Sequence, residues 1–384
     1  MATPKRKDTI CEAAIVAFSF NKDCSEAVFS PNNHLLYIVS CKDKTDCTTW
    51  EIDATLEQHD QSVSATAWHG STNRILSCSQ DRTAFVWQCN SKGKWKPQMV
   101  MLDAGVKRGL TCCAWNHSGS KVYVGSAAAN VAVGRFDAEN EWWICRLLEG
   151  HTSTVTTLAP HPSDDALLAS GGTDGKLRLV STFMKKLDEK KTASFGHVYL
   201  EKKFGAWVHA AAWAPSGRRF AVATHDSRVH VFDVPTIERL CAGAEEAVTM
   251  HRINLAVLPL KSLAFVSEDH LVGGGFDYFP VLFTPSAEAG GWRLSGKWTA
   301  CQTRGVKTAQ QVAREKFQNE ARMGQAEVLD EGQTRHKNTI NGVLRLRGDA
   351  GAAFNSDLKE PVFATASLDG RVEAWTMGEM VSIT

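Results

Sequence analysis

The chain has 384 residues, of which 43% are hydrophobic and 22% are charged, and its formal net charge at pH 7 is +1. This length suits two domains or one large repeat architecture, since a single core usually stops growing at about 250 to 300 residues. A balanced charge produces no global field to attract nucleic acid or an anionic bilayer, so neither kind of partner is expected.

The cysteines and the apolar runs argue against further classes. Eleven cysteines is an odd number, none are spaced as Cys-x-x-Cys, and Cys112 and Cys113 are adjacent. This pattern fits neither a disulfide framework nor a zinc ribbon, and it indicates reduced thiols in a cytosolic protein. No apolar run approaches the roughly 20 residues that span a bilayer. Asp8 and Glu12 interrupt the apolar start, so we predict a strand there and not a signal peptide.

One short pattern recurs along the chain: two runs of strand-forming residues separated by a turn. In its clearest form the turn carries Ser-x-Asp, and Trp follows the Asp six positions later. In chain order the copies are FSPNNHLLYIV (29–39), SQDRTAFVW (79–87), GSAAANVAVGRF (125–136, with Ala129 in place of Asp), GGTDGKLRLV around Asp174, THDSRVHVF around Asp226, GGFDYFPVLF around Asp277 and SLDGRVEAW (367–375). The pattern therefore occurs seven times.

The spacing of the copies predicts the fold. Asp174 and Asp226 are 52 residues apart, and Asp226 and Asp277 are 51 apart. A period near 50 with an aromatic residue after the turn Asp is typical of the WD-repeat β-propeller. We predict an all-β fold, in which residues 1–384 form a single seven-bladed propeller with a partly helical insertion at 302–335 between the last two blades.

The ends of the chain are expected to close the ring. Only a short tail follows Trp375. We therefore predict that residues near Thr9 to Cys11 provide the outer strand of the last blade, which removes an exposed sheet edge.

The repeated polar residues predict a buried network between blades. A turn Asp can bond to a His in the loop before the blade, that His to a strand Ser or Thr, and the hydroxyl to the Trp indole. The complete sets are His59, Ser77, Asp81 and Trp87, and His336, Thr365, Asp369 and Trp375. The partial sets are His151 with Ser170 and Asp174, and His209 with Asp226, where Val180 and Phe232 replace the indole.

Recurring Ser, His and Asp also suggest a hydrolase. A nucleophile needs a solvent-facing hydroxyl beside an oxyanion hole, whereas these hydroxyls fall inside predicted strands. The sequence lacks a Gly-x-Ser-x-Gly elbow, a Walker loop and histidine pairs with metalloprotease spacing. We expect no catalytic, metal-binding or cofactor-binding residues, and the solvent exposure of Ser77 and Thr365 discriminates between the two interpretations.

Several stretches outside the repeated turns are more specific. They are QDRTAFVW with WKPQMVML (80–102), FDAENEWWICRLL (136–148), FMKKLDEK (183–190), AWVHAAAWAPSGRRFAVATHDSRVHVFD (206–233) and SLAFVSEDHLVGGGFDYFPVLF (262–283). In this order they resemble subunit 1 of the actin-related protein 2/3 complex. Segments 240–260 and 347–360 carry no such motif.

The resemblance implies a non-catalytic scaffold subunit of an assembly that nucleates branched actin filaments. Its implied partners are the actin-related proteins, small subunits 4 and 5, the actin filament, and the acidic tails of Wiskott-Aldrich-type activators, which basic surfaces would bind. The implied location is the actin cytoskeleton of the cytoplasm, in cortical patches or cell projections. The alternative is a generic WD-repeat adaptor, such as a substrate receptor of a ubiquitin ligase, which would co-purify with a cullin linker.

The insertion at 302–335 adds a separate feature. Its Thr308-x-x-Gln311 is a capping box, and small residues recur along one predicted helical face where Phe317 is the one large side chain. A solvated helix and an amphipathic anchor that binds a partner groove both fit this pattern. The resemblance favours the anchor and implies contact with actin or an actin-related protein. The residues proposed for this contact are Arg314, Glu315, Lys316, Phe317, Asn319 and Arg322.

Overall fold

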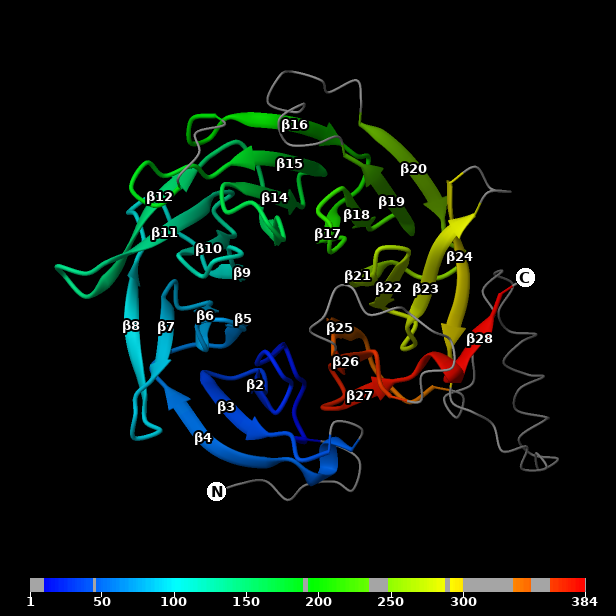
Figure 1. Ribbon diagram of the computed structural model, residues 1–384, viewed down its shortest axis with the longest axis horizontal. Helices are drawn as coiled ribbons and strands as arrows, with labels where there is room; N and C mark the ends of the chain where they lie inside the picture. The colour runs from blue at the N-terminus through cyan, green and yellow to red at the C-terminus, as the bar shows by residue number, and fades with distance from the viewer. Residues whose placement is uncertain are drawn as a thin grey trace.

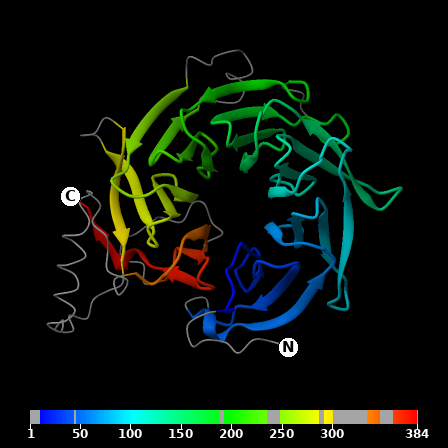
Figure 2. The same cartoon turned by 180° about the vertical axis from the view of Figure 1, so that it is seen from behind.

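The computed structural model describes residues 10–43, 46–188, 193–234, 248–286, 291–299, 334–346 and 360–383. Seven antiparallel blades follow one another in a ring, with the first strand of each blade nearest the centre (Figure 1). The same ring is seen from behind in Figure 2. The predicted seven-bladed β-propeller is therefore confirmed.

The first four blades each contain four strands, ordered from the centre outward along the chain. Blade 1 holds β1 (Ala17–Phe20), β2 (Glu26–Ser30), β3 (Leu35–Ser40) and β4 (Glu51–Glu57), with the 3-10 helix η1 (Cys47–Thr49) before β4. Blade 2 holds β5 (Val63–His69), β6 (Arg74–Ser79), β7 (Ala84–Cys89) and β8 (Trp95–Met101). Blade 3 holds β9 (Leu110–Trp115), β10 (Lys121–Ser126), β11 (Val131–Asp137) and β12 (Trp142–Leu148). Blade 4 holds β13 (Val155–Pro160), β14 (Leu167–Gly172), β15 (Lys176–Ser181) and β16 (Val198–Lys203).

Blade 5 keeps this plan, and the last two blades depart from it. Blade 5 holds β17 (Val208–Trp213), β18 (Arg219–Thr224), β19 (Arg228–Asp233) and β20 (Thr249–Asn254). Blade 6 holds β21 (Leu260–Ser267), β22 (His270–Gly275), β23 (Val281–Ser286) and β24 (Gly291–Trp298). Blade 7 holds β25 (Ile340–Arg345), β26 (Phe363–Ser367) and β27 (Val372–Trp375), and is followed by the 3-10 helix η4 (Met377–Glu379) and by β28 (Met380–Ser382).

Burial explains why the middle strands read as continuous apolar runs. Every residue of β10 and β14 is buried, whereas most residues of the outer strands β4 and β8 are exposed or half-buried. A middle strand is covered on both faces by neighbouring blades, so it has no solvent-facing side that would favour polar residues. The strict apolar and polar alternation of a half-buried sheet is therefore lost in the middle of each blade.

The hydrophobic core lies between adjacent blades. At the junction of blades 7 and 1, for example, Ile15 and Phe20 pack in one buried cluster with Ala364 and Val372. In the described part of the chain, each of the other six junctions contains a cluster of the same kind. The ring is therefore closed by apolar packing as well as by backbone pairing.

Two outer strands pair in ways that the sequence did not predict. β8 and β12 run parallel for a short distance, and this pairing joins blades 2 and 3 into one eight-stranded sheet. The C-terminal β28 pairs antiparallel with β24 and becomes a fifth strand of blade 6 (Figure 1). The chain therefore ends on blade 6 and not on blade 7.

The last blade has three strands among the described residues. Ile10 donates its backbone N–H to the Gly370 carbonyl at 3.1 Å, at the turn that precedes β27. Ile10 and Cys11 are not part of a strand, so this end of the predicted closing strand is placed incorrectly, and Thr9 lies outside the described residues. The N-terminal segment nevertheless contacts blade 7, because Asn341 also donates to the Ile15 carbonyl at 2.6 Å.

Candidate functional site

The structure brings together the four residues predicted for blade 2. The Trp87 indole N–H donates to Ser77 Oγ at 2.9 Å, and Ser77 Oγ lies 2.8 Å from His59 Nε2. His59 Nδ1 lies 3.2 Å from an oxygen of Asp81. Because the indole can only donate, the consistent arrangement has the Ser77 hydroxyl donating to Nε2 and the Nδ1–H donating to Asp81. The network lies within one blade, whereas the sequence had suggested a position between blades.

The serine of this network cannot reach a substrate. Ser77 and the equivalent Thr365 are both 0% exposed. Each hydroxyl oxygen already accepts a hydrogen bond from an indole and contacts a histidine. A nucleophilic hydroxyl needs access to solvent and an adjacent oxyanion hole. The Ser-His-Asp order therefore has a structural role at these positions.

Blades 7 and 4 contain the second complete set and the first partial set. In blade 7 the Trp375 indole donates to Thr365 Oγ1 at 2.7 Å, and His336 Nε2 lies 2.6 Å from the same oxygen. The remaining contact is looser, with His336 Nδ1 3.5 Å from Asp369. In blade 4 a histidine bridges the other two residues without an indole. Its contacts are His151 Nε2 to Ser170 Oγ at 3.0 Å and His151 Nδ1 to Asp174 Oδ2 at 3.1 Å.

The partial set predicted for blade 5 is wrong. His209 lies within β17 and its Nε2 is 2.8 Å from His225 Nδ1, so it does not contact Asp226. The Asp226 carboxylate instead accepts from Thr224 and pairs with Arg228. His209 is not at the position equivalent to His59. His59 lies four residues before its inner strand, whereas His209 lies inside its inner strand.

The equivalent position in blade 5 is occupied by Phe204, four residues before β17. The Phe204 ring lies 4.5 Å from the His230 ring, while in blade 2 the His59 ring lies 5.0 Å from Phe85. His230 and Phe85 each follow their turn Asp by four residues. Blade 5 therefore keeps the pair of rings with the two residue types exchanged. The equivalent residue can be found in the sequence by counting four positions back from the inner strand. Searching for the nearest histidine finds the wrong residue.

The turn aspartates share a role that the sequence analysis missed. One oxygen of Asp81 accepts from the Thr83 amide at 2.7 Å, and the other accepts from the Asp60 amide at 2.8 Å. Asp174 and Asp369 accept from the equivalent amides of their blades. In blade 6, which has no histidine at this position, Asp277 still accepts from the Leu258 amide. The aspartate therefore ties the turn to the incoming loop even without its histidine.

In blades 2 and 4 the surroundings favour the neutral form of the histidine and the charged form of the aspartate. Burial lowers the pKa of His59 and His151 below the ordinary value, although the nearby carboxylates oppose this change. Burial by itself would raise the pKa of Asp81, but hydrogen bonds from the Thr83 hydroxyl and amide outweigh it, so that this pKa is lowered. The pKa of Asp174 is lowered by the same balance of burial and backbone hydrogen bonds.

We expect Ser77→Ala to cost more stability than Ser170→Ala. The first change leaves two buried groups without a partner, the Trp87 indole and His59 Nε2, whereas the second leaves only His151 Nε2. Each unsatisfied group costs about 1 to 3 kcal/mol. Urea unfolding of both variants measures the difference, and equal losses would show that the indole bond contributes nothing.

Stability is expected to fall in acid. Burial is the main cause that lowers the pKa of His209 and His230 to about 4. A histidine with a lowered pKa binds fewer protons in the folded than in the unfolded chain, so the free energy of unfolding decreases as pH falls below about 6.5. His230 is 5% exposed, and its shift corresponds to about 3 kcal/mol by pH 4. Asp277 and Glu373, whose pKa burial raises, act in the opposite direction.

This pH dependence is measured by urea unfolding between pH 7.5 and pH 4.5. The variant His230→Phe keeps an aromatic ring beside Phe204 but removes the titrating group, so its stability should depend less steeply on pH than that of the wild type. Parallel curves for the two proteins would show that His230 does not contribute.

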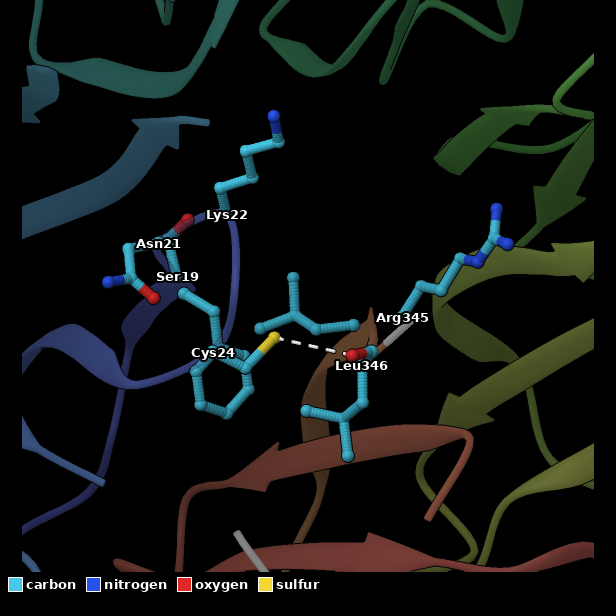
Figure 3. Close-up of a pocket in the computed structure, with 8 residues that line it drawn as sticks. Ser19, Asn21, Lys22, Cys24, Arg345 and Leu346 are labelled. Carbon is cyan, nitrogen blue, oxygen red and sulfur yellow. Dashed lines mark hydrogen bonds between the residues drawn. The ribbon is translucent and has the colours of Figure 1, made fainter. Parts of the chain in front are cut away.

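A small pocket lies at the seam of blades 1 and 7 (Figure 3). Its volume is about 130 Å³, which is below the roughly 300 to 1,000 Å³ of typical ligand pockets. The Cys24 thiol donates a hydrogen bond across the pocket to the Leu346 carbonyl at 3.5 Å. The Lys22 and Arg345 side chains extend outward from the pocket (Figure 3). The pocket is lined by Ser19, Phe20, Asn21, Lys22, Cys24, Leu344, Arg345 and Leu346. Its geometry fits a seam between blades better than a substrate site.

A buried ion pair joins blades 3 and 4. Lys121 Nζ lies 2.7 and 2.6 Å from the two carboxylate oxygens of Asp188, and both side chains are almost fully buried. The ammonium also donates to the carbonyls of Asp165 and Thr182, at 2.9 and 3.1 Å. The pKa of Lys121 is lowered by burial, and Asp188 opposes this change. This pair could not be predicted from the sequence, because its residues are 67 positions apart in the chain.

Other predicted residues lie elsewhere in the chain. The proposed contact residues Arg314, Glu315, Lys316, Phe317, Asn319 and Arg322 lie outside the described residues, as does nearly all of segment 302–335. Within the described ranges, His, Cys, Asp and Glu side chains form no group of three or more that could hold a metal ion. The helices found in the same ranges are too short or too polar to cross a bilayer.

Comparisons with known proteins agree with this geometry. The WD domain, G-beta repeat family matches residues 50–88, 142–181 and 190–233. Actin-related protein 2/3 complex subunit 1A-B of Xenopus laevis is 31% identical over 373 residues, which cover 94% of this chain and 93% of the relative. Actin-related protein 2/3 complex subunit 1 of Schizosaccharomyces pombe is 32% identical, with 86% and 89% covered. Subunit 1A of Arabidopsis thaliana is 30% identical, with 96% and 95% covered.

Proposed function

Because the chain belongs to the family of actin-related protein 2/3 complex subunit 1, we propose that it is a scaffold subunit of such a complex and catalyses no reaction itself. The similarity to these relatives extends over nearly the whole chain, and this observation carries the proposal. The full burial of Ser77 and Thr365 supports a structural role for its Ser-His-Asp and Thr-His-Asp sets.

The proposed partners are those of a branched-actin nucleator. They are the actin-related proteins, small subunits 4 and 5, the actin filament, and the acidic tails of Wiskott-Aldrich-type activators. A rigid ring with several exposed faces suits simultaneous contact with many partners. We propose that the protein acts in the cytoplasm, where it supports branched filaments in cortical patches or cell projections.

Affinity capture from the organism's own cells tests this function. Tagged full-length protein is purified and its stoichiometric partners are identified by mass spectrometry. We expect actin-related proteins and the smaller subunits in equal amounts. Recovery of a cullin linker without actin-related proteins would instead identify a ubiquitin-ligase adaptor and reject the scaffold proposal.

The segment 302–335 is proposed to contact actin or an actin-related protein, with Phe317 as its anchor. Burying an exposed Phe is worth roughly 1.5 to 3 kcal/mol, so Phe317→Ala should leave the complex assembled but reduce branch formation. Branches are counted by fluorescence microscopy with purified complex. Val312→Ala is the matched control, because it removes an apolar side chain from a different face of the predicted helix. Normal branching by an assembled Phe317→Ala complex would reject the anchor.

A further inference from the structure

The outer strands of blades 2 and 3 form one continuous sheet. In this parallel pairing Trp143 lies opposite Val100, and Ile144 lies opposite Met101. The outer edge of a blade normally presents unpaired N–H and C=O groups that another strand can join. Here the backbone groups of β8 and β12 pair with each other instead. A partner at this place therefore has to contact side chains and cannot extend the sheet by adding a strand.

Large apolar side chains cover the outward face of this joint. Val100 and Trp143 are buried in the core between the two blades. Because side chains alternate between the faces of a strand, the residues beside them point to the opposite face. Three of these are exposed, Met99 by 47%, Met101 by 41% and Trp142 by 39%. We call this surface the Met-Trp face, and it consists of Met99, Met101, Trp142 and Ile144.

The charges around the Met-Trp face differ between its two ends. Arg135 lies opposite Ile144, and the exposed Arg146 follows two residues later on the same face, where its guanidinium stacks on a phenylalanine ring at 4.1 Å. At the other end, Asp137 lies opposite Trp142. An occupant with acidic residues at one end would therefore bind in one orientation.

We propose that the Met-Trp face binds an amphipathic helix of another subunit of the complex, whose acidic end lies beside Arg135 and Arg146. A helix fits because it satisfies its own backbone and presents an apolar stripe to the sheet. Methionine side chains adapt to the shape of such a stripe, and Trp142 supplies a large rigid anchor. This inference rests on the proposed function, since it takes the occupant to be a subunit of the same assembly.

Photo-crosslinking identifies the occupant directly. The crosslinking amino acid p-benzoylphenylalanine replaces Met99 or Trp142 in tagged full-length protein, and the assembled complex is irradiated and digested. We expect both positions to crosslink to one segment of one subunit, with apolar residues at helical spacing and acidic residues at one end. The control position is Met250 on the outer strand of blade 5, which is 40% exposed and should not capture this segment. Crosslinks that are absent, or that join only this chain to itself, would overturn the proposal.

A charge-insertion variant measures the energetic contribution. Met101→Glu with Trp142→Glu should melt at the wild-type temperature, because both side chains are exposed, but recover at least tenfold less of the crosslinked subunit. Met250→Glu should recover the wild-type amount. If the wild-type protein recovers no subunits of the complex, the proposed function fails. If it recovers them and the double variant recovers them equally, only the Met-Trp face is rejected.

Discussion

Asp188→Ala is expected to lower the free energy of unfolding by about 3 to 5 kcal/mol, the usual cost of removing one partner of a buried ion pair. The substitution leaves the Lys121 ammonium buried with only the carbonyls of Asp165 and Thr182 as acceptors. It also removes the acceptor of the Met184 amide, which lies 2.6 Å from Asp188 Oδ2. Urea unfolding monitored by tryptophan fluorescence measures the loss.

Two further variants separate a buried charge from a general loss of packing. Lys121→Met combined with Asp188→Leu should recover much of the stability, since replacing a buried pair by apolar residues is often neutral or stabilising. Asp269→Ala breaks an exposed ion pair with Arg219, in which the aspartate side chain is 62% exposed. Such a pair is worth less than about 1 kcal/mol. A double variant as unstable as Asp188→Ala would contradict the explanation by an uncompensated charge.

The features that could be predicted from sequence are local and repeated. Asp81 and Trp87 lie six positions apart on one turn and strand, and the same spacing recurs at Asp369 and Trp375. A period near 50 residues then determines the number of blades, because each copy is one unit of the same shape. Similarity along the whole chain gave the family, which the turns alone could not have done.

The features that were missed depend on contacts between units. Lys121 and Asp188 meet only because blades 3 and 4 are adjacent, and the two residues are 67 positions apart in the chain. The pairing of β28 with β24 was missed for the same reason, because it joins the C-terminal tail to a different blade, blade 6. His209 was misassigned because a histidine near the right position was counted without its distance from the inner strand. Phe204 shows that this distance is the more reliable guide.

Deleting residues 1–9 is expected to destabilise the propeller even though it removes none of the described contacts of Ile10. In blades 4 and 5 the residue after the outer strand donates to the carbonyl that follows the turn Asp, from Phe204 to Gly175 and from Leu255 to Ser227. Ile10 makes the same hydrogen bond to Gly370. By this equivalence we propose that the preceding residues, which lie outside the described part of the chain, form the outer strand of blade 7.

The strand register in blades 4 and 5 indicates how many backbone hydrogen bonds this deletion would remove. Lys203 lies opposite Lys176, and Asn254 lies opposite Arg228, each two positions after the turn Asp. The Ala374 carbonyl accepts from Arg335 at 3.2 Å, so we expect pairing along Arg371 to Glu373 only. About three ladder hydrogen bonds at roughly 0.5 to 1.5 kcal/mol each give a loss of about 2 to 4 kcal/mol.

Three proteins compared by thermal and urea unfolding test this closure of the ring. A deletion of residues 1–9 should lose the ladder alone, and Ile10→Ala should lose the packing of a side chain that is 4% exposed. A deletion of residues 1–12 should lose both, because the two contributions come from different contacts. Unchanged stability after the first deletion, together with a clear loss in Ile10→Ala, would show that the ring is closed by the core between blades 7 and 1 without an N-terminal strand.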